Sequence, residues 1–304
     1  MSNTLILGGS GLVGSNFSHG TKLSSKDVNL LNYEDTLRCF DYYKPETIIH
    51  SASKKVSSQL LQLQKADYFH ENMTMNLNVF KAANNVGVKK LISLASINAF
   101  PYKTGEFFNE DDLFIGEPHI TNYADAYNHR MKHILSKAYG DQYGMKSSTV
   151  FLSNTYGSSF GHVCNGVVPI VIDKCYKAMT NNEDMVLKGD GSDVRDFIYV
   201  KDVVKLIEML MSVRLTESII ISSGVQSSIR EVVDIVVDKM NFKGKVIWEK
   251  WENKEIDNIS KKYCDNTKLK TFFPNFEFTS LEDGLSETIE WYLNNTDKFK
   301  ENII

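Results

Sequence analysis

The chain has 304 residues, a length that can bury a substantial core. Its 34 basic and 38 acidic side chains give a net charge of only −4 at pH 7, which argues against binding nucleic acid or membranes through bulk charge. The four cysteines form no Cys-x-x-Cys or Cys/His cluster, so we predict neither a metal site nor a disulfide framework. No basic and apolar leader precedes the first predicted strand, and no apolar run approaches the roughly 18 residues that span a bilayer, so we expect a cytoplasmic protein without membrane segments.

The first predicted element leads directly into a glycine-rich loop. Leu5–Leu7 is an apolar run typical of a buried parallel strand, and the sequence G-G-S-G-L-V-G follows it at once. Gly8 permits a tight turn, Gly11 lets the backbone approach a pyrophosphate, and Gly14 lets the next helix pack on the strand. Such a loop can be purely structural, but its place after the first strand favours dinucleotide binding. The predicted cofactor contacts here are Gly8, Ser10, Gly11, Leu12, Val13 and Gly14.

Beyond this loop, predicted helices and strands alternate. We predict, in chain order, a helix at Leu12–His19, a strand at Thr47–Ala52, a helix at Glu71–Val86, a strand at Leu91–Ala95, a helix at Asp125–Tyr143, a strand at Ser147–Leu152 and a helix at Val167–Met179. This order is typical of an α/β protein with a Rossmann-type, doubly wound parallel sheet.

The alternation loosens after Met179, and no Pro/Gly/Ser-rich linker separates two halves. We therefore expect interleaved lobes: a dinucleotide-binding domain at 1–160, joined by elements near 195–222, and a smaller substrate-binding lobe at 161–304. A lysine-rich stretch at 241–275 contains Trp248 and Trp251, but the acids among its lysines favour an ordinary solvated face over a nucleic-acid patch.

Several motifs along the chain carry a family resemblance. Besides the glycine loop, they are His50-Ser51-Ala52, Leu94-Ala95-Ser96, Asn154-Thr155-Tyr156-Gly157, Arg195-Asp196-Phe197-Ile198-Tyr199 and Ser280-Leu281-Glu282-Asp283-Gly284. With them the chain resembles the extended short-chain dehydrogenases/reductases (the NAD-dependent epimerase/dehydratase family), and within that family the GDP-L-fucose synthase branch. The resemblance spans nearly the whole chain. It implies an NAD(P)-dependent enzyme acting on a nucleotide-linked, GDP-linked sugar, and a homodimer formed through the helices at 71–86 and 125–143.

The resemblance also implies roles for individual residues. Ser96 corresponds to the serine that hydrogen-bonds the reacting sugar oxygen, with a strand-end cap as the alternative, and Ser51 and Ala52 lie at the cofactor. Arg195 corresponds to a diphosphate contact, a role that suits a guanidinium. The remaining implied substrate contacts are Asn98, Asn154, Val167, Lys174 and Lys262, for which core, turn or solvated surface positions are the alternatives.

The family's catalytic pair is absent. Members normally carry a tyrosine and a lysine four residues apart on one helix, where the ammonium lowers the phenol pKa for proton transfer, yet none of the 14 tyrosines here has a lysine four residues later. A gapless register places Asp125 at the tyrosine position and His129 at the lysine position. Tyr127 is a further candidate, but it lies about 200° around the helix from Asp125. Lys132 does not complete a pair with Tyr127, because five residues separate them by about 140°.

Asp125 and His129 could form a substitute relay, since they lie one helical turn apart and a carboxylate can hold an imidazole and raise its pKa. The alternative is an inert, solvated pair on an exposed helix face. Epimerisation in the fucose synthases requires a cysteine and a histidine, and the matching positions here are Asn98 and Gly166, neither of which is an acid or a base. His162, in a shortened loop, is a candidate replacement.

The cofactor is expected to be NADP, with NAD not excluded. An NAD enzyme of this fold usually ends its second strand with an acid for the ribose hydroxyls, whereas this strand is predicted to end near Ser24, Ser25 and Lys26, whose hydroxyls and ammonium suit a 2′-phosphate. Asp27, one residue on, favours NAD.

Two functions therefore follow from the sequence. The first is an NAD(P)-dependent oxidoreductase of a nucleotide-linked sugar, a 4-keto reductase or dehydrogenase with or without epimerase activity, using Ser96 and an unusual proton relay. The second is a non-catalytic relative that binds cofactor and nucleotide sugar as a regulatory protein. Retained substrate contacts favour the first function, and the missing pair favours the second.

Overall fold

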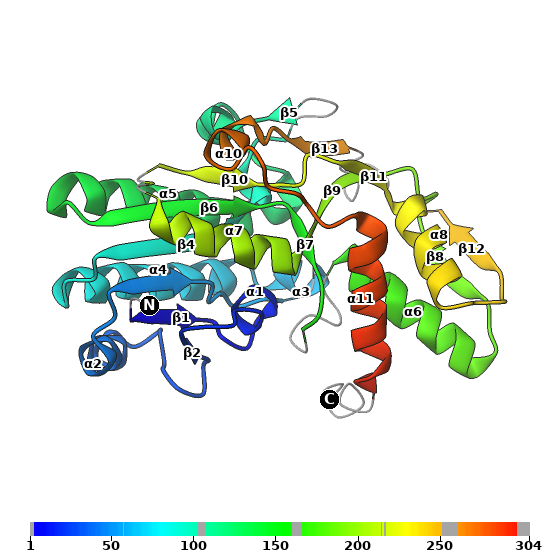
Figure 1. The fold of residues 1–304 in the computed structure, drawn as a ribbon, viewed down its shortest axis with the longest axis horizontal. Coiled ribbons are helices and arrows are strands. Elements are labelled where there is room, and N and C mark those ends of the chain that lie inside the picture. The colour runs from blue at the N-terminus through cyan, green and yellow to red at the C-terminus, as the bar shows by residue number, and fades with distance from the viewer. Residues whose placement is uncertain are drawn as a thin grey trace.

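The fold is built on a six-stranded, fully parallel sheet with the strand order β10-β6-β4-β3-β1-β2 (Figure 1). The computed structural model describes residues 3–56, 58–102, 107–159, 166–213, 215, 217–250 and 261–296. The strands of this sheet are β1 (Thr4–Leu7), β2 (Thr21–Leu23), β3 (Thr47–His50), β4 (Lys90–Ser96), β6 (Lys146–Leu152) and β10 (Ile219–Ile221). The predicted doubly wound α/β fold is confirmed.

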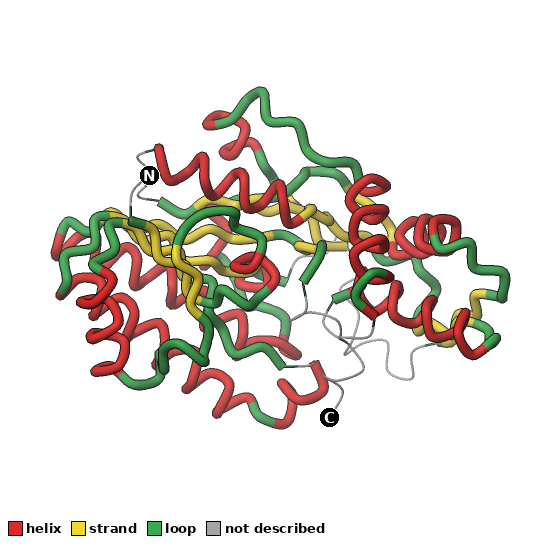
Figure 2. The backbone as a smooth tube through the Cα atoms, turned by 60° about the horizontal axis from the view of Figure 1, so that its bottom comes forward, coloured by secondary structure: helices red, strands yellow, loops and turns green. Residues whose placement is uncertain are grey.

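Helices cover both faces of this sheet, as Figure 2 shows. Side chains alternate along each strand, so Leu5 and Leu7 of β1 pack on one face while Ile6 packs on the other. The first face is covered by α2 (Tyr33–Tyr43), α4 (Lys65–Asn85) and α5 (Tyr123–Tyr143). The second face is covered by α7 (Val200–Ser212) and α10 (Thr267–Phe272). Both faces are apolar because both are buried, which explains the nearly continuous hydrophobic strands.

A second cluster of elements forms its own hydrophobic core beside the sheet, to the right in Figure 1. Its helices are α6 (Val167–Asn181), α8 (Ile229–Lys239) and α11 (Leu281–Leu293), and β8 (Met185–Lys188) pairs there with β12 (Val246–Glu249). A further sheet has the order β11-β9-β13-β5, made of β11 (Gln226–Ser228), β9 (Val194–Tyr199), β13 (Lys261–Cys264) and β5 (Phe107–Phe108). β7 (Asn154–Tyr156) pairs with β9 and so connects this sheet to the end of β6.

The remaining elements are short and line the loops at one edge of the main sheet. They are α1 (Leu12–Ser15), α3 (Ser58–Leu63) and the 3-10 helices η1 (Ile97–Ala99), η2 (Glu110–Phe114) and η3 (Ile120–Asn122). No helix among the described residues is long and apolar enough to cross a membrane.

Several predicted boundaries differ from the structure, three of them as follows. The helix predicted to reach His19 ends at Ser15, where the side-chain amide of Asn16 donates hydrogen bonds to the carbonyls of Leu12 and Ser158. β3 ends at His50, two residues early. Conversely, α4 begins at Lys65 and not at Glu71; its first turns carry mostly polar side chains and give no apolar periodicity.

Candidate functional site

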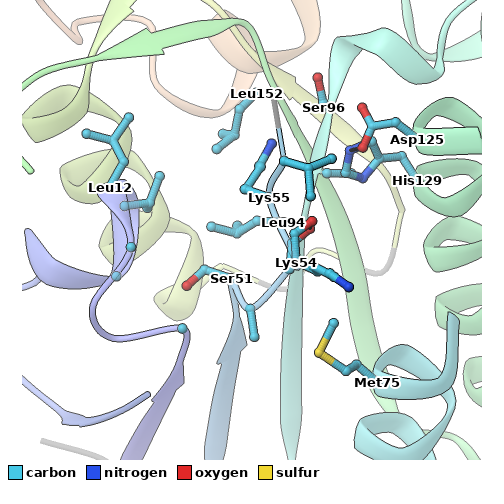
Figure 3. Close-up of a pocket in the computed structure, with 18 of the residues that line it drawn as sticks. Leu12, Ser51, Lys54, Lys55, Met75, Leu94, Ser96, Asp125, His129 and Leu152 are labelled. Carbon is cyan, nitrogen blue, oxygen red and sulfur yellow. Dashed lines mark hydrogen bonds and ion pairs between the residues drawn. The ribbon is translucent and has the colours of Figure 1, made fainter. Parts of the chain in front are cut away.

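A cleft of about 1070 Å³ opens at the carboxyl edge of the main sheet, where β1, β3, β4 and β6 end. From β1 the chain adds β2 on one side and then β3, β4 and β6 on the other, so the strand order reverses between the neighbouring strands β1 and β3. Ligands of open α/β sheets bind outside the carboxyl ends of the strands at such a switch point. Figure 3 shows this cleft between Leu12 of the glycine loop on one side and Asp125 and His129 on the other.

Among the three glycines of the loop that are spaced three residues apart, Gly8 and Gly14 are tightly packed and Gly11 is open. A Cβ on Gly14 would lie 2.2 Å from the carbonyl oxygen of Gly8, and a Cβ on Gly8 would lie 2.7 Å from the amide nitrogen of Ala52. A Cβ on Gly11 would meet only the carbonyl of Gly8, at 3.3 Å. The loop therefore leaves room for close approach of a ligand at Gly11, as a dinucleotide pyrophosphate requires.

Most predicted cofactor residues line this cleft: Gly8, Ser10, Gly11, Leu12, Val13, Gly14, Ser24, Ser25, Ser51 and Ala52. Lys26 is exposed and is not among the lining residues. The carboxylate of Asp27 accepts hydrogen bonds from the amide and hydroxyl of Ser24, both at 2.7 Å, and these bonds lower the pKa of Asp27. The Asp27 carboxylate is thus already bonded to Ser24, so it is less suited to bind the ribose hydroxyls of NAD, and the site favours the 2′-phosphate of NADP.

On the opposite wall, α5 carries Asp125 and His129 into the cleft beside Ser96 (Figure 3). Only 6% of Asp125 and 3% of His129 is exposed, so the alternative of a solvated surface pair is excluded. Nε2 of His129 lies 3.2 Å from Oδ1 of Asp125, but neither ring nitrogen makes a well-aligned hydrogen bond within the described residues. Buried polar atoms without partners are rare in proteins, and these two suggest a ligand or water.

Two further residues of this wall escaped the sequence reasoning. The Tyr68 hydroxyl of α4 donates a hydrogen bond of 2.5 Å to Oδ1 of Asp125. The Lys132 ammonium, buried with 1% exposure, donates to the carbonyl of Leu94 at 2.8 Å. Lys132 could have been found, because the spacing i, i+4, i+7 puts it on one helix face with Asp125 and His129. Tyr68 belongs to another helix, and the sequence around it does not indicate its contact with Asp125.

The electrostatics of this cluster follow from burial and from its lysines. Burial raises the pKa of Asp125, but the neighbouring His129 and Lys55 and the hydrogen bond from the phenol outweigh it, so the pKa of this carboxyl lies well below its ordinary value. Burial lowers the pKa of His129, and Asp125 offsets only part of this effect. Asp125 does raise the pKa of His129 as expected, but burial lowers it by more, so the pKa of His129 lies below its ordinary value. At neutral pH the pair is a carboxylate beside a neutral imidazole.

Lys132 is the third perturbed group of the cluster. Burial, reinforced by the charge of Lys55, lowers the pKa of Lys132 to about 7, although Asp125 favours its charged form. Lys55 follows β3 and points into the cleft in Figure 3. Such clusters of perturbed ionisable groups in a cleft are typical of functional sites.

Other candidates lie elsewhere. The Tyr127 hydroxyl hydrogen-bonds to Glu117, and Tyr127 is not among the cleft residues, because it occupies a different face of α5. The ammonium of Lys174 donates to the carbonyl of Val186 at 2.7 Å, and the guanidinium of Arg195 donates to the carbonyl of Val194 at 2.9 Å.

None of these three residues lines the cleft, and neither does Val167, which packs against the core of the second cluster. Lys262 pairs with Arg195 through the β13 backbone, and His162 lies outside the described residues.

Asn98, Asn154 and Gly166 do line the cleft. The Asn154 amide donates to the carbonyl of Asp196 at 3.0 Å, and the backbone amide of Asn98 donates to the Ser96 hydroxyl at 3.2 Å. Asn98 and Gly166 offer no acid or base. The Ser96 oxygen caps η1, as the strand-end alternative predicts, and Ser96 also lines the cleft.

Comparison with known proteins gives a consistent picture. A model of the NAD dependent epimerase/dehydratase family matches residues 4–219. The GDP-L-fucose synthase of Dictyostelium discoideum is 33% identical over 96% of this chain and 95% of that protein, and the GDP-L-fucose synthase of Escherichia coli (strain K12) is 28% identical over 89% and 88%. A crystal structure of a GDP-L-fucose synthetase from Naegleria fowleri bound to NADP has a TM-score of 0.84 and 29% identity, covering 97% of this chain and 93% of that chain.

The matched region of the family model contains the glycine loop, Ser96 and the altered pair on α5. The Dictyostelium discoideum relative extends the match through the second cluster of elements. This chain therefore belongs to the NAD-dependent epimerase/dehydratase family, as its motifs predicted.

Proposed function

We propose that this chain is an NADP-dependent oxidoreductase that acts on a GDP-linked keto sugar, with Asp125 and His129 as its proton relay. The observation that carries the proposal is the burial of these two side chains beside Ser96, across the cleft from a glycine loop shaped for a pyrophosphate. A remnant without function would have no reason to keep a charged carboxylate and an imidazole buried together, because burying ionisable groups is costly in a folded protein.

The cofactor and substrate class come from the relatives and from the cleft. The relatives are named GDP-L-fucose synthases, and the Naegleria fowleri structure holds NADP. In this chain the glycine loop would hold the pyrophosphate, and Ser24 and Ser25, beside the engaged Asp27, would face the adenosine ribose and its phosphate. A reduced nicotinamide supplies a hydride to a carbonyl carbon when it is bound.

The chain's own residues must then supply a proton to the carbonyl oxygen. Ser96 orients that oxygen with its hydroxyl, which sits at the end of β4. His129 donates the proton when it is protonated and accepts one in the oxidising direction. Asp125 holds the imidazole and stabilises its charged form through a separation of 3.2 Å.

The reaction that fits best is reduction or oxidation at the ketone carbon without epimerisation. Proton exchange at the neighbouring carbons needs an acid and a base, whereas the cleft presents Asn98 and Gly166 at the matching positions. We propose Asn154, which lines the cleft, as a contact of the sugar nucleotide. Arg195, Lys174 and Lys262 remain proposed diphosphate contacts.

We further propose a cytoplasmic homodimer formed through α4 and α5. These helices pack against each other on one face of the sheet. Both also expose large apolar side chains, with Leu77 of α4 48% exposed and Ile134 of α5 43% exposed. A dimer would bury them.

The test is turnover. The purified protein is incubated with GDP-4-keto-6-deoxy-mannose and related nucleotide sugars, each with NADPH and with NADH, and the absorbance of the reduced cofactor is followed. Asp125→Asn and His129→Gln should each slow oxidation of the cofactor by about 100-fold or more. Tyr127→Phe, which alters a phenol outside the cleft, should not. Tight binding of cofactor and sugar without turnover of any sugar would refute the oxidoreductase and favour the alternative, a regulatory protein.

A further inference from the structure

Tyr68, Asp125, His129 and Lys132 are ionisable side chains buried together beneath the cleft. They come from two helices, α4 and α5. Burying ionisable groups costs several kcal/mol per charge unless each is paired, so a cluster of four is not expected from packing alone. The relay proposed above uses only two of the four.

We propose that Tyr68 and Lys132 are positioning residues of this relay: Tyr68 fixes the Asp125 carboxylate from the neighbouring helix, and Lys132 supplies the positive charge behind His129. Tyr68 belongs to α4 and Lys132 to α5, so two helices contribute to the relay. This inference rests on the proposed function and specifies how its relay is controlled.

The geometry of Tyr68 supports its role. Its hydroxyl donates to the same carboxylate oxygen, Oδ1, that lies nearest the His129 ring. Burial, followed by the nearby Asp125, raises the pKa of Tyr68, so the phenol stays protonated and acts as a donor. It therefore draws negative charge away from the oxygen that faces His129.

The position of Lys132 supports its proposed role beside His129. Helical side chains tilt toward the N-terminus, so Lys132 reaches back along α5 toward His129 and β4. Its ammonium is held by the carbonyl of Leu94, two residues before Ser96. The positive charge of Lys132 disfavours protonation of His129, whereas Asp125 favours it.

The groups that act on the His129 ring come from every neighbouring element. Asp125 and Lys132 share its helix, and Lys55 acts from the segment after β3. Tyr68 acts through Asp125 from α4. His50, at the end of β3, interacts with Lys132 and is held neutral near pH 7, since burial and that charge lower the pKa of His50 to about 3.

The experiment is an NMR titration of the His129 imidazole in the free protein, with the resonance assigned from its loss in His129→Gln. Tyr68→Phe removes one oxygen, and Lys132→Met removes one charge; each should raise the pKa of His129 by about one unit. Asp125→Asn should lower it by a similar amount. Tyr127→Phe, which removes the same oxygen from a tyrosine outside the cleft, is the matched control and should change nothing.

The inference is overturned if Tyr68→Phe and Lys132→Met both leave the titration of His129 as Tyr127→Phe does. Because the titration needs no substrate, its outcome is separate from that of the turnover assay. The predicted shifts without turnover would retain the cluster and refute the oxidoreductase. Turnover without the shifts would retain the oxidoreductase and refute the roles of Tyr68 and Lys132. If Tyr68→Phe does not fold, Lys132→Met, which should gain stability, decides the result alone.

Discussion

Replacing Lys132 with methionine should stabilise the protein at neutral pH while impairing its proposed relay. The side chain is 1% exposed, and methionine is a close apolar match in length. Burial lowers the pKa of Lys132 from 10.5 to about 7. Since one pKa unit corresponds to about 1.4 kcal/mol, this site costs on the order of 4 kcal/mol of unfolding free energy at pH 7.

The variant does not recover all of this unfolding free energy. Removing the ammonium leaves the Leu94 carbonyl without its donor, which costs about 1–3 kcal/mol. We therefore expect Lys132→Met to raise the unfolding free energy at pH 7 by about 2 kcal/mol, the balance of these two effects. Lys137→Met, on the same helix but with a side chain that is 68% exposed, is the control and should change stability by less than about 0.5 kcal/mol.

The pH dependence gives the sign of the effect. The pKa of Lys132 is lower in the folded chain than in the unfolded chain, so the unfolded chain binds the extra proton between pH 7 and 10.5. The unfolding free energy of the parent chain should therefore rise with pH in this window, relative to that of the variant. Urea denaturation at several pH values measures the difference. An effect of Lys132→Met on the unfolding free energy that is the same at every pH would show that the pKa of Lys132 is not lowered in the folded chain, and would refute the reasoning.

Three further predictions test other parts of the site. Gly14→Ala should weaken NADPH binding by about 1–3 kcal/mol, because its Cβ would lie 2.2 Å from the Gly8 carbonyl oxygen. Gly140→Ala, whose Cβ would make an ordinary contact at 3.5 Å, should leave the affinity unchanged. Fluorescence titration measures both affinities, and equal values would contradict a tight contact between Gly14 and Gly8. Burial lowers the pKa of His129 below 6.5. As the pH rises through that lowered pKa, kcat/KM for reduction should fall and the rate of oxidation should rise. The same pH profile for reduction and oxidation would contradict a histidine relay. Ser96→Ala should lower kcat of reduction by about 10-fold or more while leaving NADPH affinity unchanged, and a loss confined to cofactor binding would show that Ser96 only caps η1.

The fold could be predicted from the sequence because its signals are local. Leu5–Leu7 is apolar and is followed at once by the glycine loop, and the structure places Gly8 and Gly14 where any side chain would collide with backbone. The same local logic failed for the first turns of α4, where Tyr68 is a buried residue among polar neighbours. Its burial is determined by α5, which a single helical pattern does not reveal.

Only part of the candidate site could be predicted from the sequence, for the same reason. Asp125 and His129 could be located by spacing on one helix, but their burial depends on the tertiary contacts of α5 and on Tyr68. Lys132 does not pair with Tyr127, but its spacing from Asp125 and His129 puts it on their face of α5. Arg195 and Lys174 bond to nearby carbonyls, so a basic residue type alone did not define a place in the cleft.

The most direct test of the central claim is hydride transfer itself. NADPH carrying deuterium at the reactive nicotinamide position is incubated with the protein and a GDP-linked 4-keto sugar, and the sugar product is examined by mass spectrometry and NMR. The proposed function predicts deuterium on the former carbonyl carbon, and its loss in His129→Gln. An unlabelled sugar, recovered unchanged from a protein that still binds NADPH, would contradict it.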